Sequence, residues 1–193
     1  QDKKGCLKTL AQNVPGTYVP QFYKTTYHAD GTLEAFKPVR DVPDKVKRRY
    51  LEDLNSAPTC SVILTPDTTF ENTYLIEVGR GCPHGCRFCS AGFVYRPPRF
   101  RHQSIIDKCL KRGESMTDHI GLVGAAVTDF PDFNQLCGHA FEKETRISFS
   151  SLRANALSPE LLSILRHSKT KTATIAPDAG SERMRKVINK GIT

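Results

Sequence analysis

The segment "TYLIEVGRGCPHGCRFCS", residues 73–90, joins an apolar run to three closely spaced cysteines. Its first half is rich in β-branched and aromatic residues and predicts a buried strand over residues 73–79. Its second half places Cys82, Cys86 and Cys89 within eight residues, with glycines before and between them. The segment therefore predicts a strand whose carboxyl end opens directly into a thiol-rich loop.

Three thiols in one loop are compatible with three kinds of site. A dithiol pair of Cys86 and Cys89 would give a CxxC oxidoreductase, but it leaves Cys82 without a role. Zinc needs four ligands, usually in two separated pairs, and so short a loop would be strained around it even with His84 as a ligand. An iron–sulfur cluster fits the CxxxCxxC spacing best, because three thiolates hold three corners of a [4Fe–4S] cube and leave one iron open.

The other four cysteines are scattered along the chain: Cys6, Cys60, Cys109 and Cys137. Seven cysteines in a 193-residue chain with helix and strand patterning argue against a disulfide scaffold. They favour a reducing compartment, so we expect a cytoplasmic protein. Cys109 and Cys137 lie within predicted helices and are expected to be small core residues.

The overall composition is that of an ordinary globular protein, 38% hydrophobic and 25% charged. No apolar run is long enough to cross a bilayer and the start does not resemble a signal peptide, so we expect no membrane partner. The chain begins at Gln1 and finishes on "KVINKGIT" without an obvious stop. We therefore expect a piece of a longer polypeptide.

The net charge of +8 is concentrated beside the cysteines. Residues 80–112 hold eight Lys and Arg residues against Asp107 alone, a net charge of +7. A solvated surface explains such a run as well as an anion-attracting rim does. Both interpretations stay open, and an anionic compound or RNA is a candidate for the unidentified substrate.

Residues 1–58 differ in pattern from the rest of the chain. The stretch "FYKTTYHADGTLEAF" predicts two short strands joined at Asp30-Gly31 in a β-hairpin. The charged stretch "DVPDKVKRRYLEDL", residues 41–54, predicts an exposed helix or a linker. We interpret residues 1–58 as the tail of an upstream domain plus a connector.

Strands alternate with helices from residue 73 onward. The predicted strands span residues 73–79, 119–127, 146–152 and 171–177, and the predicted helices span residues 104–113, 133–143, 158–168 and 180–190. Such alternation predicts an α/β fold with parallel strands, whose sites lie at the carboxyl ends of the strands. The cysteine loop, "GAAVTD", "SSLRA" and "APDAGSE" each fall at the carboxyl end of a predicted strand, so these four segments are expected on one face.

Together these segments resemble a known family. The loop "GCPHGCRFCS", with Phe88 at the aromatic position, "GLVGAAVTDFP", "SSLRANALSPELL" and "TIAPDAGSERMRKVINKGIT" resemble the core of radical S-adenosylmethionine (SAM) enzymes. The resemblance is closest to the group with an upstream cobalamin-binding domain and to the methylthiotransferase and elongator-type branch. It implies a partial (β/α) barrel with parallel strands, in which residues 59–193 form the N-terminal part of a six-unit barrel, preceded by a small hairpin and linker region.

The resemblance also implies a set of cofactors. Cys82, Cys86 and Cys89 would ligate a [4Fe–4S] cluster whose open iron binds SAM, for reductive cleavage to a 5′-deoxyadenosyl radical or for radical methyl or methylthio transfer. The residues implied to contact SAM are Phe88, Gly124, Ala125, Ser150, Ser151, Arg153, Asp178 and Ser181. A flavodoxin- or ferredoxin-type electron donor is the implied partner, and cobalamin use through a domain outside this chain is a further implication.

Three of the implied SAM contacts can be judged from the chemistry of their residues. Arg153 suits the methionine carboxylate, because a guanidinium can donate two parallel hydrogen bonds. Ser181 equally fits the N-cap of the following helix. The segment "GAAVTD" lacks the carboxylate of the family's Gly-Gly-Glu motif, so backbone carbonyls, Thr128 or Asp129 would meet the SAM ammonium.

No catalytic residue and no histidine motif for cobalamin is found in the sequence. The alternatives to a radical SAM enzyme are a zinc-stabilised RNA-binding module and a CxxC dithiol oxidoreductase.

Overall fold

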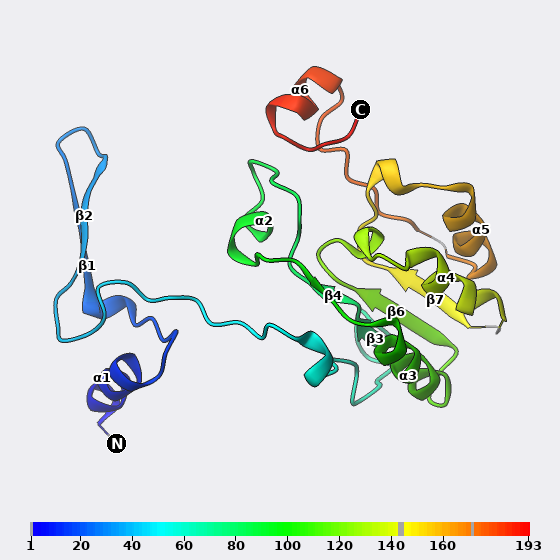
Figure 1. Cartoon of the computed structure of the whole chain (residues 1–193), viewed down its shortest axis with the longest axis horizontal. Helices are drawn as coiled ribbons and strands as arrows, with labels where there is room; N and C mark the ends of the chain where they lie inside the picture. Colours follow the sequence, from blue (N-terminus) through cyan, green and yellow to red (C-terminus); the bar gives the residue numbers. More distant parts are fainter. Residues whose placement is uncertain (1, 143–144, 171) are drawn as a thin grey trace. The chain divides into compact units, whose positions relative to one another are not determined.

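The structure is a computed structural model that describes residues 2–142, 145–170 and 172–193. The chain divides into two compact units, Gln1–Leu51 and Glu52–Thr193 (Figure 1). No helix in the described ranges is both long enough and apolar enough to cross a membrane.

The first unit contains one helix and a β-hairpin. Its elements are α1 (Lys3–Asn13), the 3-10 helix η1 (Pro20–Phe22), β1 (Tyr23–Tyr27) and β2 (Leu33–Pro38). β1 and β2 pair antiparallel, which confirms the predicted hairpin, and Gly31 in the turn has a φ of +83° that glycine adopts without steric cost. Helix α1 was not predicted, because Ala11 is its single buried residue and no apolar stripe marks it. Residues 41–53 adopt irregular backbone rather than the helix that was the first alternative, and their role as a linker stays a prediction.

The second unit follows the predicted alternation of strands and helices. Its elements are η2 (Leu54–Ser56), β3 (Tyr74–Glu77), β4 (Gly79–Arg80), α2 (Ala91–Val94), β5 (Arg99–Phe100), α3 (Gln103–Glu114), β6 (His119–Val123), η3 (Val127–Asp129), α4 (Phe133–Glu142), β7 (Arg146–Phe149), η4 (Ala154–Ala156), α5 (Pro159–His167) and α6 (Glu182–Val187). Ser158 caps α5 as predicted, since its hydroxyl accepts a hydrogen bond from the Leu161 N–H.

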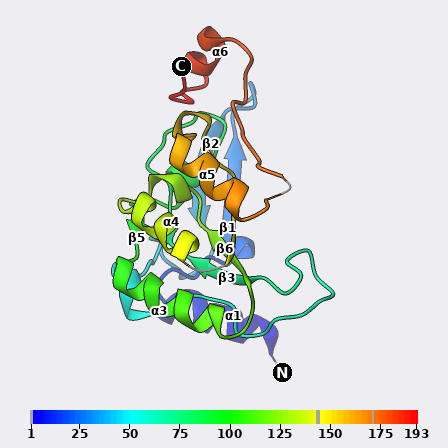
Figure 2. The same cartoon turned by 90° about the vertical axis from the view of Figure 1, so that its right-hand side faces the viewer.

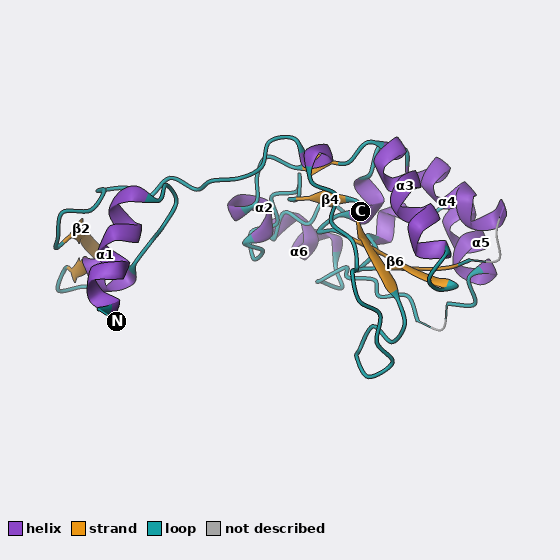
Figure 3. Ribbon diagram, turned by 90° about the horizontal axis from the view of Figure 1, so that it is seen from below, coloured by secondary structure: helices purple, strands orange, loops and turns teal. Residues whose placement is uncertain are grey.

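A three-stranded parallel sheet in the order β3-β6-β7 forms the centre of the second unit. Helices α3, α4 and α5 cover one face of this sheet (Figure 3), and Figure 2 shows the same helices in succession from another side. Alternate strand residues point to the helices and form the core. The fully buried members of this core include Tyr74, Ile76, Ile106, Leu110, Ile120, Leu122, Leu136 and Ile147. The core therefore confirms a parallel α/β arrangement.

The fourth strand predicted over residues 171–177 is wrong. Residue 171 lies outside the described residues, and the described part of the segment contributes one isolated parallel bridge, between Leu152 and Ile175. Ile175 is 41% exposed, so it does not supply the buried apolar face that stabilises a strand. The described chain accordingly forms a three-stranded part of an α/β fold rather than a closed barrel.

Arg101 ties residues 54–59 to the sheet. Its side chain is 1% exposed, and its guanidinium lies 2.5 Å from the Glu77 carboxylate and 3.0 Å from the Thr59 hydroxyl. The same guanidinium donates to the backbone carbonyls of Leu54 and Ala57. A buried cation is tolerated when its donors are paired in this way, whereas removal of one partner leaves an uncompensated charge.

The segment next to Thr59 covers the outer edge of β3. The Ser61 N–H donates to the Leu75 carbonyl at 2.9 Å, and the Glu77 N–H donates to the Thr59 carbonyl at 3.0 Å. These bonds pair an edge that would otherwise expose backbone donors and acceptors. These bonds agree with the start of the second unit at Glu52.

We expect Arg101→Ala to lower the free energy of unfolding by about 3–5 kcal/mol, because the variant leaves the partly buried Glu77 with one arginine partner fewer. Urea denaturation of the chain measures this loss. Arg146→Ala is the matched control, since Arg146 pairs with Asp118 at 2.9 Å on an exposed surface and its loss should cost less than about 1 kcal/mol. Equal losses in the two variants would contradict a structural role for the buried pair.

The pKa of Glu77 predicts a pH dependence of stability. Burial opposes ionisation of this carboxyl, but hydrogen bonds from Arg80 and Arg101 outweigh burial and lower its pKa below the ordinary 4.5. Because the folded pKa is the lower one, Glu77 stabilises the fold above about pH 4.5, and this contribution is lost as the pH falls through the folded value. The free energy of unfolding should therefore decline more steeply below pH 4.5 in the wild type than in Glu77→Gln. Parallel declines would show that another group is responsible.

Candidate functional site

The cysteine loop, residues 81–90, begins at the carboxyl end of the sheet, directly after β4. Gly81 has a φ of +93°, and a Cβ atom there would lie 2.3 Å from the Tyr95 carbonyl oxygen. A Cβ atom on Gly92 of α2 would lie 2.0 Å from the His84 carbonyl oxygen. Only glycine fits both positions, so the backbone path of the loop depends on close packing against α2 and the residues after it.

The loop supplies three unbridged thiols. Cys86 is buried, whereas Cys82 and Cys89 are partly exposed. Burial raises the pKa of Cys82, a hydrogen bond from the His84 backbone opposes this rise, and the charges of Asp129 and of the other two thiols add to it. No three His, Cys, Asp or Glu side chains in the described part of the chain are grouped closely enough to hold a metal ion. The three thiols of the loop therefore do not converge on one point in the described structure.

His84 links the loop to the end of β6. Its Nε2 atom lies 2.6 Å from Oδ2 of Asp129, and the two side chains are 28% and 26% exposed. Asp129 belongs to η3, which follows β6 in the "GAAVTD" segment. The neighbouring Thr128 has a buried hydroxyl without a hydrogen-bond partner among the described residues. The loop is thus anchored to one of the segments predicted to share its face.

The segment after α6 forms the second anchor of the loop. The Arg87 N–H donates to the Ile188 carbonyl at 2.9 Å, and the Arg87 guanidinium donates to the Val187 carbonyl at 2.7 Å. The Asn189 side chain donates to the Gly85 carbonyl at 2.8 Å. Residues 187–189 and the cysteine loop are therefore one structural piece, although about 100 residues separate them.

Lys190 connects three of the residues implied to bind SAM. Its ammonium pairs with the Asp178 carboxylate and lies 5.7 Å from the centroid of the Phe88 ring, a cation–π distance. The Arg153 guanidinium donates to the carbonyls of Lys190 and Gly191 at 3.3 and 3.2 Å. The structure thus brings Phe88, Arg153 and Asp178 together around one lysine.

Sequence reasoning missed Lys190. Asn189 and Gly191 on either side of it have φ values of +55° and +65°, so the backbone turns sharply after α6. This turn directs residues 187–191 to the cysteine loop and to Arg153. The available signal was an Asn and a Gly just past a helix, a common pattern at helix C-termini.

The other implied SAM contacts fall into separate places. The Ser150 hydroxyl donates to the Gly124 carbonyl at 3.0 Å, so these two residues meet at the carboxyl ends of β6 and β7. Ala125 and Ser151 are exposed beside them. The Ser181 hydroxyl accepts a hydrogen bond from the Met184 N–H at 3.3 Å, which is the helix-capping role considered as its alternative.

The basic run beside the cysteines is partly engaged within the protein. Arg80 pairs with Glu77 at 2.7 Å, and Arg96 donates to the Pro83 carbonyl at 3.0 Å. Arg87 and Arg101 make the structural bonds described above. Part of the positive charge that suggested an anion-attracting rim therefore stabilises the loop and the sheet.

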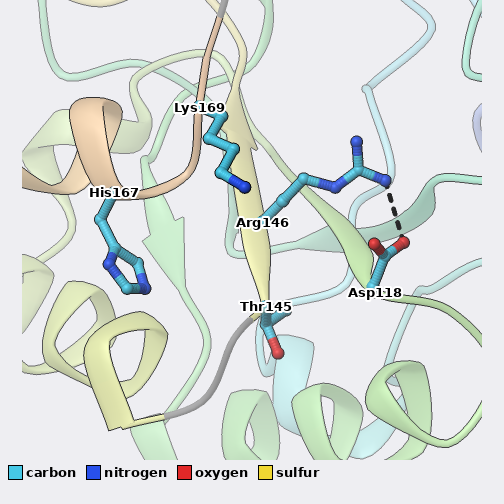
Figure 4. Close-up of a pocket in the computed structure, with 5 residues that line it drawn as sticks. All are labelled: Asp118, Thr145, Arg146, His167 and Lys169. Atoms are coloured by element: carbon cyan, nitrogen blue, oxygen red, sulfur yellow. Dashed lines mark hydrogen bonds and ion pairs between the residues drawn. The ribbon is translucent and has the colours of Figure 1, made fainter.

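A cavity of about 590 Å³ lies at the other end of the sheet, where β6 and β7 begin. Figure 4 shows its lining residues Asp118, Thr145, Arg146, His167 and Lys169, with the Arg146–Asp118 pair marked. None of these residues belongs to the cysteine loop or to the implied SAM contacts. This cavity and the cysteine site occupy opposite ends of the strands.

Comparisons with known proteins point to one family. The model of the radical SAM superfamily matches residues 76–193, more than half of the chain. An uncharacterized protein of Methanocaldococcus jannaschii is 38% identical over 157 residues, which cover 77% of this chain and 34% of that protein. The chain therefore spans about a third of the length of the curated relative it matches.

The His84–Asp129 bond predicts how accessible the loop thiols are. Asp129→Ala should raise the rate of iodoacetamide labelling at the buried Cys86 by about 10- to 150-fold, because loss of a charged hydrogen bond of about 1.5–3 kcal/mol favours opening of the loop. Mass spectrometry of each cysteine in the metal-free chain measures the rates. Asp118→Ala serves as the control, and Cys86 labelling that is equally slow in both variants would show that the bond does not hold the loop.

Proposed function

The chain belongs to the radical SAM superfamily, and we propose that Cys82, Cys86 and Cys89 bind a [4Fe–4S] cluster used for the reductive cleavage of SAM. Membership makes this chain part of an enzyme, and the family implies the cluster and SAM as cofactors. The observation that carries the proposal is the loop of three free thiols at the carboxyl end of a parallel sheet, within the matched residues.

The donors of the loop fit such a cluster. Thiolates are the usual ligands of iron–sulfur centres, and all three loop cysteines are free to supply them. The loop offers no fourth cysteine, which leaves one iron for SAM. When bound, the reduced cluster supplies the electron that splits SAM into methionine and a 5′-deoxyadenosyl radical.

The residues around Lys190 are the best candidates to hold SAM. Phe88 offers a 56%-exposed aromatic face to the adenine, and Arg153 offers a guanidinium to the methionine carboxylate. The carbonyls of Lys190 and Gly191 accept hydrogen bonds from Arg153 and fix the position of its guanidinium. Asp178 is assigned to the adenosine, and Lys190 fixes its carboxylate next to the Phe88 ring.

The carboxyl ends of β6 and β7 complete the proposed site. The Gly124–Ser150 contact places backbone carbonyls and hydroxyl groups there, and Ala125 and Ser151 lie exposed beside it. These groups are assigned to the SAM ammonium and ribose. Residues 187–191 cover one side of the loop and help to exclude water, which protects a reactive radical from quenching.

The wider organisation is also proposed. Residues 1–58 act as a connector from an upstream domain, and residues 59–193 form the N-terminal part of a six-unit barrel. The proposed partners are a flavodoxin- or ferredoxin-type donor and a substrate that is an anionic compound or RNA. Cobalamin use and the methylthiotransferase branch stay predictions, since the match is to the superfamily as a whole. Nothing observed in the described residues favours a zinc module or a dithiol oxidoreductase over this function.

Anaerobic reconstitution with iron and sulfide should give the full-length protein about four irons at this loop, and Cys82→Ala, Cys86→Ala or Cys89→Ala should abolish their binding. Each replacement removes one thiolate from a set of three. Cys6→Ala is the control, because Cys6 is exposed in the first unit and should leave the iron content unchanged. Tight zinc binding without iron binding would point to the zinc alternative instead.

Arg153→Ala should weaken SAM binding to the reconstituted protein by about 2–5 kcal/mol, because an anion in a desolvated site loses its charged partner. Equilibrium dialysis measures the affinity, and the iron content confirms that the cluster is intact. The exposed Arg166 at the end of α5 gives the control variant Arg166→Ala. An unchanged affinity in Arg153→Ala would remove Arg153 from the site.

A further inference from the structure

The first unit exposes aromatic side chains that its own core does not use. That core consists of Ala11, Val19 and Phe22. Tyr18 and Phe36 lie outside these residues and are 48% and 46% exposed. Two large rings in water, in a unit that already has a core, suggest a contact surface.

The exposed rings of Tyr18 and Phe36 both pack against the ring of Tyr23. Phe36 on β2 stacks on Tyr23 of β1, with centroids 5.1 Å apart and planes only 2° from parallel. Tyr18 lies 5.1 Å from Tyr23 at an angle of 41°. The Tyr23 hydroxyl donates to the Pro43 carbonyl at 2.8 Å, which fixes the central ring. We call Tyr18, Tyr23 and Phe36 the aromatic platform.

A hollow of about 460 Å³ lies beside the aromatic platform. It is lined by Gly16, Tyr18, Tyr23, Phe36, Asp44, Lys45, Val46 and Arg48. Its size suits a flat ring system, and two cations against one carboxylate give it a positive balance. Aromatic ring faces and positively charged side chains therefore line the same hollow.

The charge of the whole unit has the same sign. Gln1–Leu51 carries ten Lys and Arg residues against five Asp and Glu residues, a net charge of +5 out of the chain's +8. Lys24 and Lys37 are direct cross-strand partners in the hairpin, and like charges in that position oppose folding. Their side chains lie on the hairpin face opposite to Tyr23 and Phe36, so they add to the charge of the unit rather than to that of the aromatic platform.

We propose that the aromatic platform binds single-stranded nucleic acid, with bases stacked on Tyr18 and Phe36 and phosphates near Lys45 and Arg48. Aromatic faces beside a basic surface are the elements that such binding uses, because every base has a π-face and every linkage a negative charge. A neutral or proline-rich peptide would use the rings but would gain nothing from a net charge of +5. This site shares no residue with the cysteine loop, and the proposal does not depend on the cluster or on SAM.

Fluorescence anisotropy with labelled 12-residue oligouridylate and oligothymidylate tests the proposal on the full-length protein. Phe36→Leu and Tyr18→Leu keep an apolar side chain but remove the π-face, and each should weaken binding by about 5- to 100-fold. Tyr27→Leu is the control, because Tyr27 is 63% exposed at the end of β1 and lies outside the hollow. Its affinity should match that of the wild type.

The salt dependence of oligonucleotide binding provides a second test of the proposal. Lys45→Gln should reduce the salt dependence of binding by about one unit in the slope of log K against log salt, as expected for one lost phosphate contact. Circular dichroism checks that the variants fold, and their iron content should equal that of the wild type, which separates this site from the cysteine loop. Equal affinities for the RNA and DNA oligonucleotides would show that stacking and charge, rather than the sugar, determine binding, as proposed.

Three results would overturn the proposal. The first is the absence of oligonucleotide binding at low salt. The second is an affinity within twofold of wild type in both leucine variants, which would place any binding elsewhere. The third is binding that heparin, a polyanion without aromatic rings, reproduces with the same losses in the leucine variants, since the rings of Tyr18 and Phe36 would then not act by stacking on bases.

Discussion

The candidate site depends on the hydrogen bonds that hold the cysteine loop between two distant parts of the second unit. His84 bonds to Asp129 at the end of β6, and Arg87 bonds to the carbonyls that follow α6. Each such bond contributes about 1 kcal/mol net, more where a charged group takes part. A short loop of this kind cannot fix its own conformation, so its thiols are positioned by residues about 45 and 100 places further along the chain.

Local patterns predicted most of the fold, whereas contacts between distant residues escaped prediction. The three parallel strands and helices α3, α4 and α5 followed from hydrophobic periodicity, and the hairpin followed from Asp30-Gly31. The strand predicted over residues 171–177 failed because Ile175 remains exposed and finds no apolar layer to join. Burial of Arg101 against Glu77 was not foreseen either, since a charged residue in a basic run gives no local sign that it will be buried.

In the candidate site too, local sequence patterns were predictive, whereas contacts between residues far apart in the sequence were not predicted. The spacing of the cysteines and the aromatic Phe88 identified the loop, and the carboxyl ends of predicted strands identified Gly124 and Ser150, which the structure brings into contact. The grouping of Phe88, Arg153 and Asp178 depends on Lys190, whose backbone turn follows α6 and cannot be located from periodicity. The side chain of Cys137 lies outside the described part of the structure, whereas Cys109 is buried in the core as expected.

Electron paramagnetic resonance of the reduced, reconstituted full-length protein, recorded with and without SAM, tests the central claim most directly. Three loop thiolates with one iron open to SAM predict the signal of a reduced [4Fe–4S] cluster that changes shape when SAM is added, because SAM then becomes a ligand. Cys6→Ala should show the same change. A cluster signal that is identical with and without SAM would contradict an open iron at this loop, and with it the proposed function.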